Sequence, residues 1–461
     1  MIYELLITTL SLLAGSSIAS LLGYKKLIAL IPVGLLIAVV LRTSSFSILN
    51  LIDQLQLNIT VWFLLTSLAV VIAAIKGKLL IQLKLLAVVV PVSITAVLIT
   101  RLERFGAPIY GDPSWILSMS QMMQSGLDME ILNGRVSIKR GFAFPLMLAL
   151  GQPGEYLSAL PAVLFIALVL AVIWGARELF PNSSKLGLII AGLVILSAPI
   201  VIRSALYLNG HVLMALAVTV AVVMVLVSVR KAQLDNQQLI TLMVALSVIA
   251  TTRAEGIAIA AVIALPLIAT RWISRAQLML ITTSATLSFG IWLAVYNSYI
   301  LNSTGLPWPV FVLILVGLGL LVALKPLDAV RFRILWIAII AELVVLIAAL
   351  AIFFEELQNG IISQFENIFL GQGLWGISLI LAFLAIIYLA LFNKDKTFVL
   401  LALALVLANV ILKMVDGGQF GEPTLGRVGW ADSLNRMWLH LMGVFALVFV
   451  SSQASSKAIR D

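Results

Sequence analysis

Residues 212–229 read VLMALAVTVAVVMVLVSV and contain no charged side chain. An α-helix rises about 1.5 Å per residue, so a helix of this length comes close to crossing a bilayer core of roughly 30 Å. Water is absent from that core, and a helix satisfies its own backbone N–H and C=O groups there. In the whole chain, 62% of the 461 residues are hydrophobic and 11% are charged. Soluble chains carry about 25% charged residues, so the composition predicts an all-α polytopic membrane protein.

Similar apolar segments recur along the chain and predict about 15 transmembrane helices. The expected spans are 3–22, 27–41, 60–75, 79–99, 156–174, 186–203, 212–229, 239–251, 257–270, 277–297, 309–324, 334–353, 374–392, 398–413 and 438–450.

The distribution of Lys and Arg orients these spans in a cell membrane. If the N-terminus lies outside, every connection on one face carries at least two positive charges, which is the cytoplasmic signature. Net charge +9 is then a topology signal, and no nucleic-acid partner is expected. The basic residues on that face are Lys25, Lys26, Lys76, Lys78, Arg177, Lys185, Arg230, Lys231, Arg271, Arg275, Lys325, Arg331, Arg333, Lys394, Lys396, Lys457 and Arg460.

Two of the connections on the opposite, outer side are long enough to hold structure. The chain then divides into three parts. N-terminal helices at 1–100 are a candidate addition to the core, and an outer loop follows at 101–155. The remaining core at 156–461 contains the second outer loop, 414–437.

The first outer loop contains YGDPSWILSMSQMMQSG, residues 110–126, which predicts an interfacial helix. Pro113 suits the first turn of a helix, Asp112 suits its N-cap, and Gly126 suits its end. Trp115 and Met119 recur at helical spacing opposite a more polar face, as in helices that lie on a membrane. Asp112 is then either a cap alone or also a reactive carboxylate.

Several basic residues break the charge rule because they fall on the outer side. Some, such as Arg101 and Arg104, fit side chains that reach the interface by snorkelling. Others crowd one short stretch of the first outer loop, lie between two spans or lie where a span begins, and they fit a polar cavity with a phosphate group as counter-ion. These are Arg135, Lys139, Arg140, Arg253 and Arg436. Glu255, two residues after Arg253, either forms a structural salt bridge with it or belongs to a site.

Five motifs in this order resemble the GT-C superfamily of polyprenyl-phosphate-sugar-dependent glycosyltransferases, which includes protein O-mannosyltransferases and aminoarabinose transferases. They are YGDPSW, KRGFAFPLMLALG, SAPIVIRSALYLNGHVLMALAVTVAVVMV, TTRAEGIAIA and WADSLNRMWLH. The resemblance covers about residues 100–300 and 425–450. The chain departs from the family pattern because four expected spans precede its acidic loop, which in the family generally follows the first span.

The resemblance implies an enzyme that transfers a sugar from a polyprenyl-phosphate donor to a protein, lipid or glycan acceptor on the extracytoplasmic side. It implies Asp112 as the general base and Arg253 and Arg436 as groups that stabilise the lipid-phosphate leaving group. Lys139 and Arg140 are further candidates for that role. Glu255 would orient Arg253 or bind sugar hydroxyls. His211 would contact the donor, or is a satisfied interfacial residue.

The resemblance implies no obligatory metal in many members, and the outer acids permit a divalent ion without requiring one. The chain has no Cys and only two His residues, which disfavours a site built from those ligands. Two other functions fit the pattern. A lipid-linked glycan ligase or polymerase would share the substrates, and a secondary transporter would share the many spans and interrupted helices.

Overall fold

The computed structural model describes residues 2–52, 54–104, 112–125, 141–150, 159–206, 208–253, 255–268, 270–296, 331–352, 354–392, 396–415 and 432–458. In these ranges every regular element is a helix and no strand occurs. In chain order they are α1 (Ile2–Leu21), α2 (Leu27–Leu51), η1 (Leu55–Leu57), α3 (Asn58–Ala73), η2 (Ala74–Lys78), α4 (Leu79–Arg104), α5 (Asp112–Ser125), α7 (Ala143–Leu148), α8 (Leu160–Leu179), α9 (Lys185–Leu196), α10 (Pro199–Leu206), α11 (His211–Lys231), α12 (Asn236–Thr252), α13 (Gly256–Ile268), α14 (Arg275–Tyr296), α16 (Arg331–Ile352), α17 (Phe354–Phe369), α18 (Ser378–Phe392), α19 (Lys396–Val415), α20 (Asp432–Met437), η6 (Trp438–Leu441) and α21 (Met442–Ala458).

Six helical segments in the described part of the chain are long and apolar enough to cross a membrane, which confirms the all-α membrane class. A seventh is counted if α9 and α10 form one span, although they are bent by 78°. The six are Tyr3–Leu21, Leu27–Asn50, Leu55–Thr100, Leu160–Leu179, His211–Lys231 and Asn435–Ala454.

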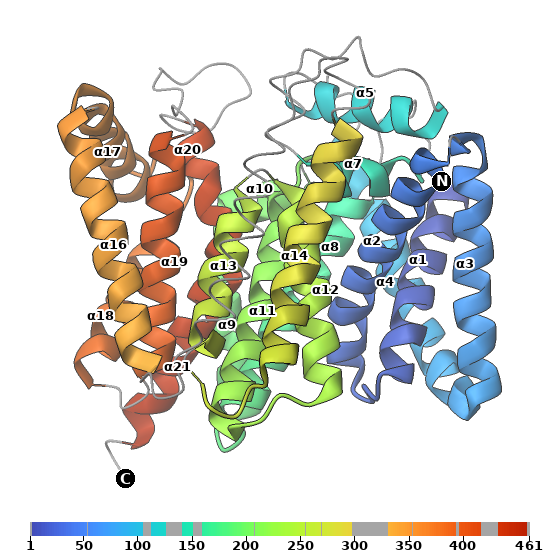
Figure 1. Ribbon diagram of the computed structural model, residues 1–461, viewed down its shortest axis with the longest axis horizontal. Helices are drawn as coiled ribbons and strands as arrows, with labels where there is room; N and C mark the ends of the chain where they lie inside the picture. Colours follow the sequence, from blue (N-terminus) through green and yellow to red (C-terminus); the bar gives the residue numbers. More distant parts are fainter. Residues whose placement is uncertain are drawn as a thin grey trace.

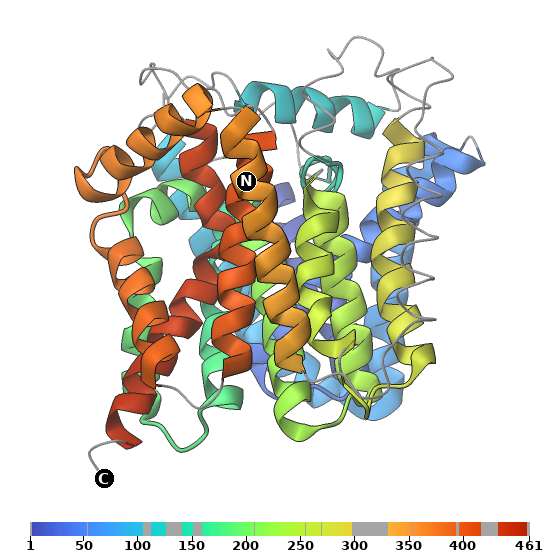
Figure 2. The ribbon, with the colours of Figure 1, turned by 60° about the vertical axis from the view of Figure 1, so that its left-hand side comes forward.

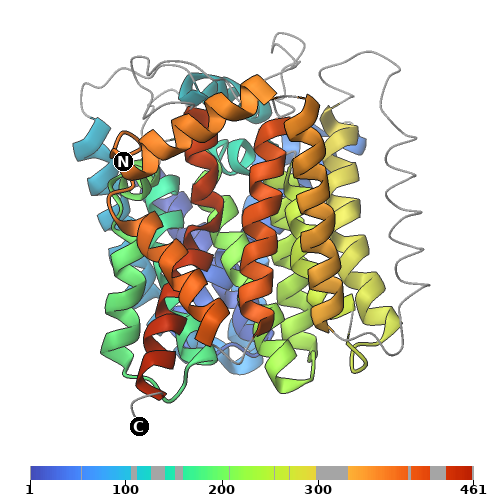
Figure 3. The same cartoon turned by 90° about the vertical axis from the view of Figure 1, so that its left-hand side faces the viewer.

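Most of these helices run side by side along one direction, and α5 lies across one end of them (Figure 1). We call this end of the bundle the α5 end. Figure 2 shows α17 at the same end, tilted away from the bundle direction. The N-terminus lies nearer to the α5 end, and the C-terminus lies at the opposite end (Figures 1 and 3).

Two predicted spans differ from the helices observed. The span predicted at 27–41 continues as α2 to Leu51, because the hydroxyls of Thr43, Ser45 and Ser47 donate to carbonyls three or four residues back and so remain satisfied within a helix. The span predicted at 186–203 is broken between α9 and α10, where Pro199 begins the second helix. The span predicted at 309–324 lies outside the described residues.

The N-terminal helices pack directly on the rest of the bundle. Helix α2 contacts α7, α8 and α12. In the turn before α2, the Tyr24 hydroxyl forms a 2.9 Å hydrogen bond with the Thr241 hydroxyl of α12. Burial raises the pKa of Tyr24, so its hydroxyl stays protonated and neutral. Helix α11 lies at the centre, with its whole apolar window buried.

The start of α7 docks on the end of α12 through a glycine. Gly141 has φ +58°, and a Cβ added there would lie 2.2 Å from the Thr251 carbonyl oxygen. The next residue, Phe142, donates its backbone N–H to that same oxygen at 3.1 Å. Only glycine permits both this conformation and this approach.

We expect Gly141→Ala to lower thermal stability in detergent more than Gly77→Ala does. Gly77, in the turn between α3 and α4, also has positive φ (+73°), but nothing lies within 4 Å of an added Cβ. The control therefore carries only the conformational cost of about 1–2 kcal/mol, whereas Gly141→Ala also breaks the contact with α12. Equal melting temperatures for the two variants would contradict the docking.

Candidate functional site

Arg253 is held at the α5 end by the tight turn that joins α12 to α13. Its backbone is extended, with φ −153° and ψ 155°, and this ends α12 at Thr252. Helix α13 begins three residues later at Gly256, where an added Cβ would lie 1.9 Å from the Ile249 carbonyl oxygen. The turn can therefore close only with glycine at this position.

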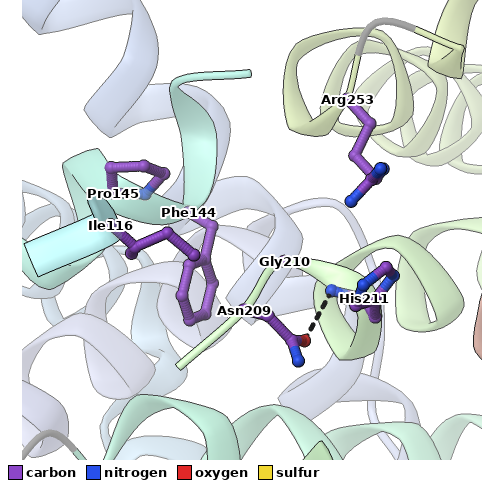
Figure 4. A pocket seen from close by; sticks show the side chains of 7 residues that line it. All are labelled: Ile116, Phe144, Pro145, Asn209, Gly210, His211 and Arg253. Atoms are coloured by element: carbon purple, nitrogen blue, oxygen red, sulfur yellow. Dashed lines mark hydrogen bonds between the residues drawn. The ribbon is translucent and has the colours of Figure 1, made fainter. Parts of the chain in front are cut away.

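Arg253 and Glu255 form the predicted pair. Arg253 Nε donates to Glu255 Oε1, and the two side chains are 15% and 12% exposed. This contact uses one edge of the guanidinium group. Its terminal nitrogens have no hydrogen-bond partner among the described residues, and Figure 4 shows them directed toward a cavity. The salt bridge and a role in the cavity are therefore compatible.

The cavity lies where α5, α7, α11 and the end of α12 meet, and it is small, with about 10 Å³ of space for the centre of a water-sized molecule. One wall is apolar and the other carries polar side chains (Figure 4). The lining residues are Ile116, Phe144, Pro145, Asn209, Gly210, His211 and Arg253.

Asn209 supplies an unused donor to this cavity. Its Oδ1 accepts the backbone N–H of His211 at 3.0 Å, which fixes the amide at the start of α11. The side chain is only 3% exposed, and Nδ2 has no hydrogen-bond partner in the described part of the chain. A buried donor left in this state costs about 1–3 kcal/mol, which a bound acceptor atom would offset.

His211 joins the cavity to the last part of the chain. Its Nδ1 lies 2.8 Å from Nε2 of His440 in η6, and both residues are buried. The rings are stacked, with centroids 4.9 Å apart. Only one proton can occupy the contact between the two nitrogens, so one ring must accept there and the pair cannot carry two positive charges. The chain's only two imidazoles are thus brought together across 229 residues.

The structure describes the positions of only some of the remaining predicted site residues. Asp112 is the first residue of α5 rather than its N-cap, a difference of one position, and it lies one turn before Ile116 of the cavity wall. Its side chain lies outside the described residues, as do Lys139 and Arg140 altogether. Arg436 is in α20, four residues before His440, and does not line the cavity.

Arg42 is a buried charge that the sequence motifs did not single out. It is 0% exposed within α2, and its guanidinium group donates to the Asn58 side chain and, at 3.4 Å, to the Leu146 carbonyl of α7. Asn58 Nδ2 in turn donates to the Met123 carbonyl of α5 at 3.3 Å. Arg42 and Asn58 therefore hold both α5 and α7 against α2. The available signal was an Arg in the apolar run IAVVLRTSS.

Within the described residues, no group of three His, Asp or Glu side chains could hold a metal ion. No family model, curated protein or solved structure matches this chain.

We expect Arg42→Met to destabilise the protein by about 1–3 kcal/mol, because it leaves buried carbonyl acceptors without a donor. Arg42→Lys should retain only part of the wild-type stability, since one ammonium group cannot reproduce the two-sided contact with Asn58 and Leu146. Chemical unfolding in detergent measures both variants. Lys84→Met is a matched control, because Lys84 is an exposed residue of α4. An Arg42→Met variant as stable as this control would show that the buried network contributes nothing.

Proposed function

We propose that this protein is an integral-membrane glycosyltransferase that moves a sugar from a polyprenyl-phosphate donor to a protein, lipid or glycan acceptor on the extracytoplasmic side. The observation that carries the proposal is the donor set of the cavity at the α5 end. A guanidinium group, a buried amide nitrogen without a partner among the described residues and an imidazole line it together. Such a set recognises an anion rich in oxygen atoms, and a phosphate group meets that description.

The phosphate would lie against Arg253. Glu255 fixes the guanidinium group through Nε, so the two terminal nitrogens keep one orientation and match two phosphate oxygens. Asn209 Nδ2 would donate to a third oxygen. Negative charge grows on this phosphate as the bond to the sugar breaks, and fixed donors in a largely buried site stabilise that charge. Arg436 does not line the cavity, and Lys139 and Arg140 lie outside the described residues, so their part in this role stays a prediction from the sequence.

Asp112 is the proposed general base. The acceptor hydroxyl oxygen would form a bond to the anomeric carbon as the bond from that carbon to the phosphate oxygen breaks. The hydroxyl proton would pass to the Asp112 carboxylate, and the lipid phosphate would leave with the bonding electron pair. The position of Asp112, one helical turn before Ile116, favours this role.

We infer that the α5 end is the extracytoplasmic end. Helix α11 begins at the cavity with His211 and ends at Arg230 and Lys231, so these two charges lie at the other end. The turn with Lys25 and Lys26 lies there too, and Lys26 pairs with Glu178 at 3.0 Å. Positive charges mark the cytoplasmic side. The shorter apolar helices, α12, α13, α18 and α19, support a total closer to the predicted number of about 15 spans.

A secondary transporter is the second candidate, because the 78° bend between α9 and α10 is the kind of helix break that transporters use. However, the polar groups of the cavity gather at one end of the bundle, whereas transporters hold substrate near the middle of the membrane. A lipid-linked glycan ligase or polymerase would use the same phosphate-binding groups.

We expect Asp112→Asn to lower sugar incorporation roughly 10²–10⁴-fold, because the amide cannot accept the proton. Membranes with wild-type or variant protein would be supplied with a radiolabelled polyprenyl-phosphate sugar. Glu366→Gln is the control, since this acid lies on α17 at the same end but does not line the cavity. Equal incorporation by wild type and Asp112→Asn would remove Asp112 from the mechanism, and solute uptake into vesicles without transfer would favour the transporter.

We expect Arg253→Lys to lower kcat roughly 10²-fold or more, because lysine keeps the charge but loses the two-pronged geometry that the leaving phosphate requires. Steady-state kinetics with the same donor measure the effect. Arg203→Lys on α10 should retain wild-type rates, since Arg203 does not line the cavity. Full turnover by the Arg253→Lys variant would contradict the proposed contact.

A further inference from the structure

Helices α3 and α4 form a hairpin at the edge of the bundle, and the turn between them lies at the end opposite the α5 end (Figure 1). The Asn58 side chain at the start of α3 donates to the Met123 carbonyl of α5, so α3 leads away from that end. The apolar segment Leu55–Thr100, which contains both helices, is 33% buried, the smallest share among the six long apolar segments. The hairpin therefore offers more of its surface to lipid than those other segments do.

Lys84 is a charged residue on the outward face of this hairpin. It is exposed on α4, and its neighbours on the same helical face, Leu80 and Leu83, are 65% and 55% exposed. It lies six residues beyond Lys78 in the turn, which corresponds to about 9 Å along the helix axis. A lysine at this depth lays its hydrocarbon stem along the apolar surface and brings its ammonium group toward the lipid head groups.

No carboxylate among the described residues neutralises Lys84. Its ammonium group has neither a hydrogen bond nor an ion pair in that part of the chain, and residues 54–102 contain no Asp or Glu. Helices α1, α2 and α8 pack on the hairpin. Helix α2 has no acid, and the only acid of α1 is Glu4, in its first turn at the α5 end. The only acid of α8 is Glu178, which pairs with Lys26 at 3.0 Å.

The turn supplies a second positive charge at the level of the head groups. Lys76 is exposed there, next to Gly77, whose positive φ of +73° forms the turn. Ile75, on the other side of Lys76, is 76% exposed. Exposed apolar side chains beside lysines are typical of protein surfaces that enter the head-group region and attract anionic lipids.

We propose that the outward face of the α3–α4 hairpin binds a phospholipid with a net negative head group, from the leaflet at the end opposite the α5 end. The phosphate oxygens accept hydrogen bonds from the ammonium groups of Lys84 and Lys76, and an acyl chain lies along Leu80 and Leu83. A zwitterionic lipid carries its own cation beside the phosphate, so the lysines favour an anionic one. The inference does not depend on the glycosyltransferase proposal, because it uses no residue of the Arg253 cavity.

Fluorescence quenching by brominated lipids tests the inference on the purified full-length protein in vesicles. The chain has no Cys, so Leu80→Cys supplies a single thiol for a fluorophore. Brominated phosphatidylglycerol should reach half-maximal quenching at a mole fraction roughly tenfold lower than brominated phosphatidylcholine does. Leu64→Cys is the matched control, because Leu64 is also 65% exposed but lies on α3 nearer the α5 end, and both lipids should quench it equally. Equal quenching at Leu80 by the two lipids would overturn the proposal.

Matched charge changes separate this site from general electrostatic attraction. In the Leu80→Cys background, Lys84→Gln should raise the half-quenching mole fraction of phosphatidylglycerol roughly fivefold. Lys26→Gln is the control, since it removes the same charge at the same end of the bundle but from a lysine that already pairs with Glu178. An equal effect of both substitutions, or no effect of Lys84→Gln, would refute the site.

A soluble competitor distinguishes a lipid from a free phosphate ester. Glycerol 3-phosphate has the phosphate of the head group but no acyl chain, so it should leave the quenching by brominated phosphatidylglycerol unchanged, whereas unlabelled phosphatidylglycerol should reverse it. Displacement by glycerol 3-phosphate as effective as that by the unlabelled lipid would contradict the assignment to a lipid.

Discussion

Polar groups inside a lipid bilayer have to find hydrogen-bond partners within the protein. This requirement explains both the conformation of single side chains and the packing of helices around the cavity. Hydroxyl groups meet it locally by bonding to carbonyls of their own helix, as Thr43, Ser45 and Ser47 do in α2. Arg42 meets it in large part across two other helices, through the Asn58 side chain of α3 and the Leu146 carbonyl of α7, and Asn58 extends the network to α5. The network that results fixes α5 and α7 over the end of the bundle, and the cavity forms beneath them.

The helices were largely predictable because membrane spans have a local signature. The predicted interfacial helix ends at Ser125, immediately before Gly126, and α13 begins where the sequence TTRAEG predicts a turn. Errors arose where a polar run continues a helix. The run after Arg42 contains hydroxyl side chains and predicts a loop, yet α2 continues through it. Hydropathy measures the cost of transfer to lipid, whereas a hydroxyl bonded to its own helix avoids much of that cost.

The site was predictable only in part because its contacts join distant segments. Arg253 and Glu255 are two residues apart, so their pair could be foreseen. The contact between His211 and His440 spans 229 residues, and no local pattern connects them. Asn209 was missed for a different reason. Its amide is ordinary in sequence, and it becomes informative only when one side of it is hydrogen-bonded and the other faces a cavity.

Unsatisfied donors and acceptors distinguish places that hold a ligand from places that hold the fold together. Arg42 has one terminal nitrogen without a partner among the described residues, but it does not line the Arg253 cavity, so its remaining contacts explain it as a structural residue. Asn209 also has an unused polar atom in that same part of the chain, but it lines the cavity next to Arg253. Helix α7 contributes Phe144 and Pro145 to the cavity wall, so the short element that Gly141 docks on α12 also helps to form the site.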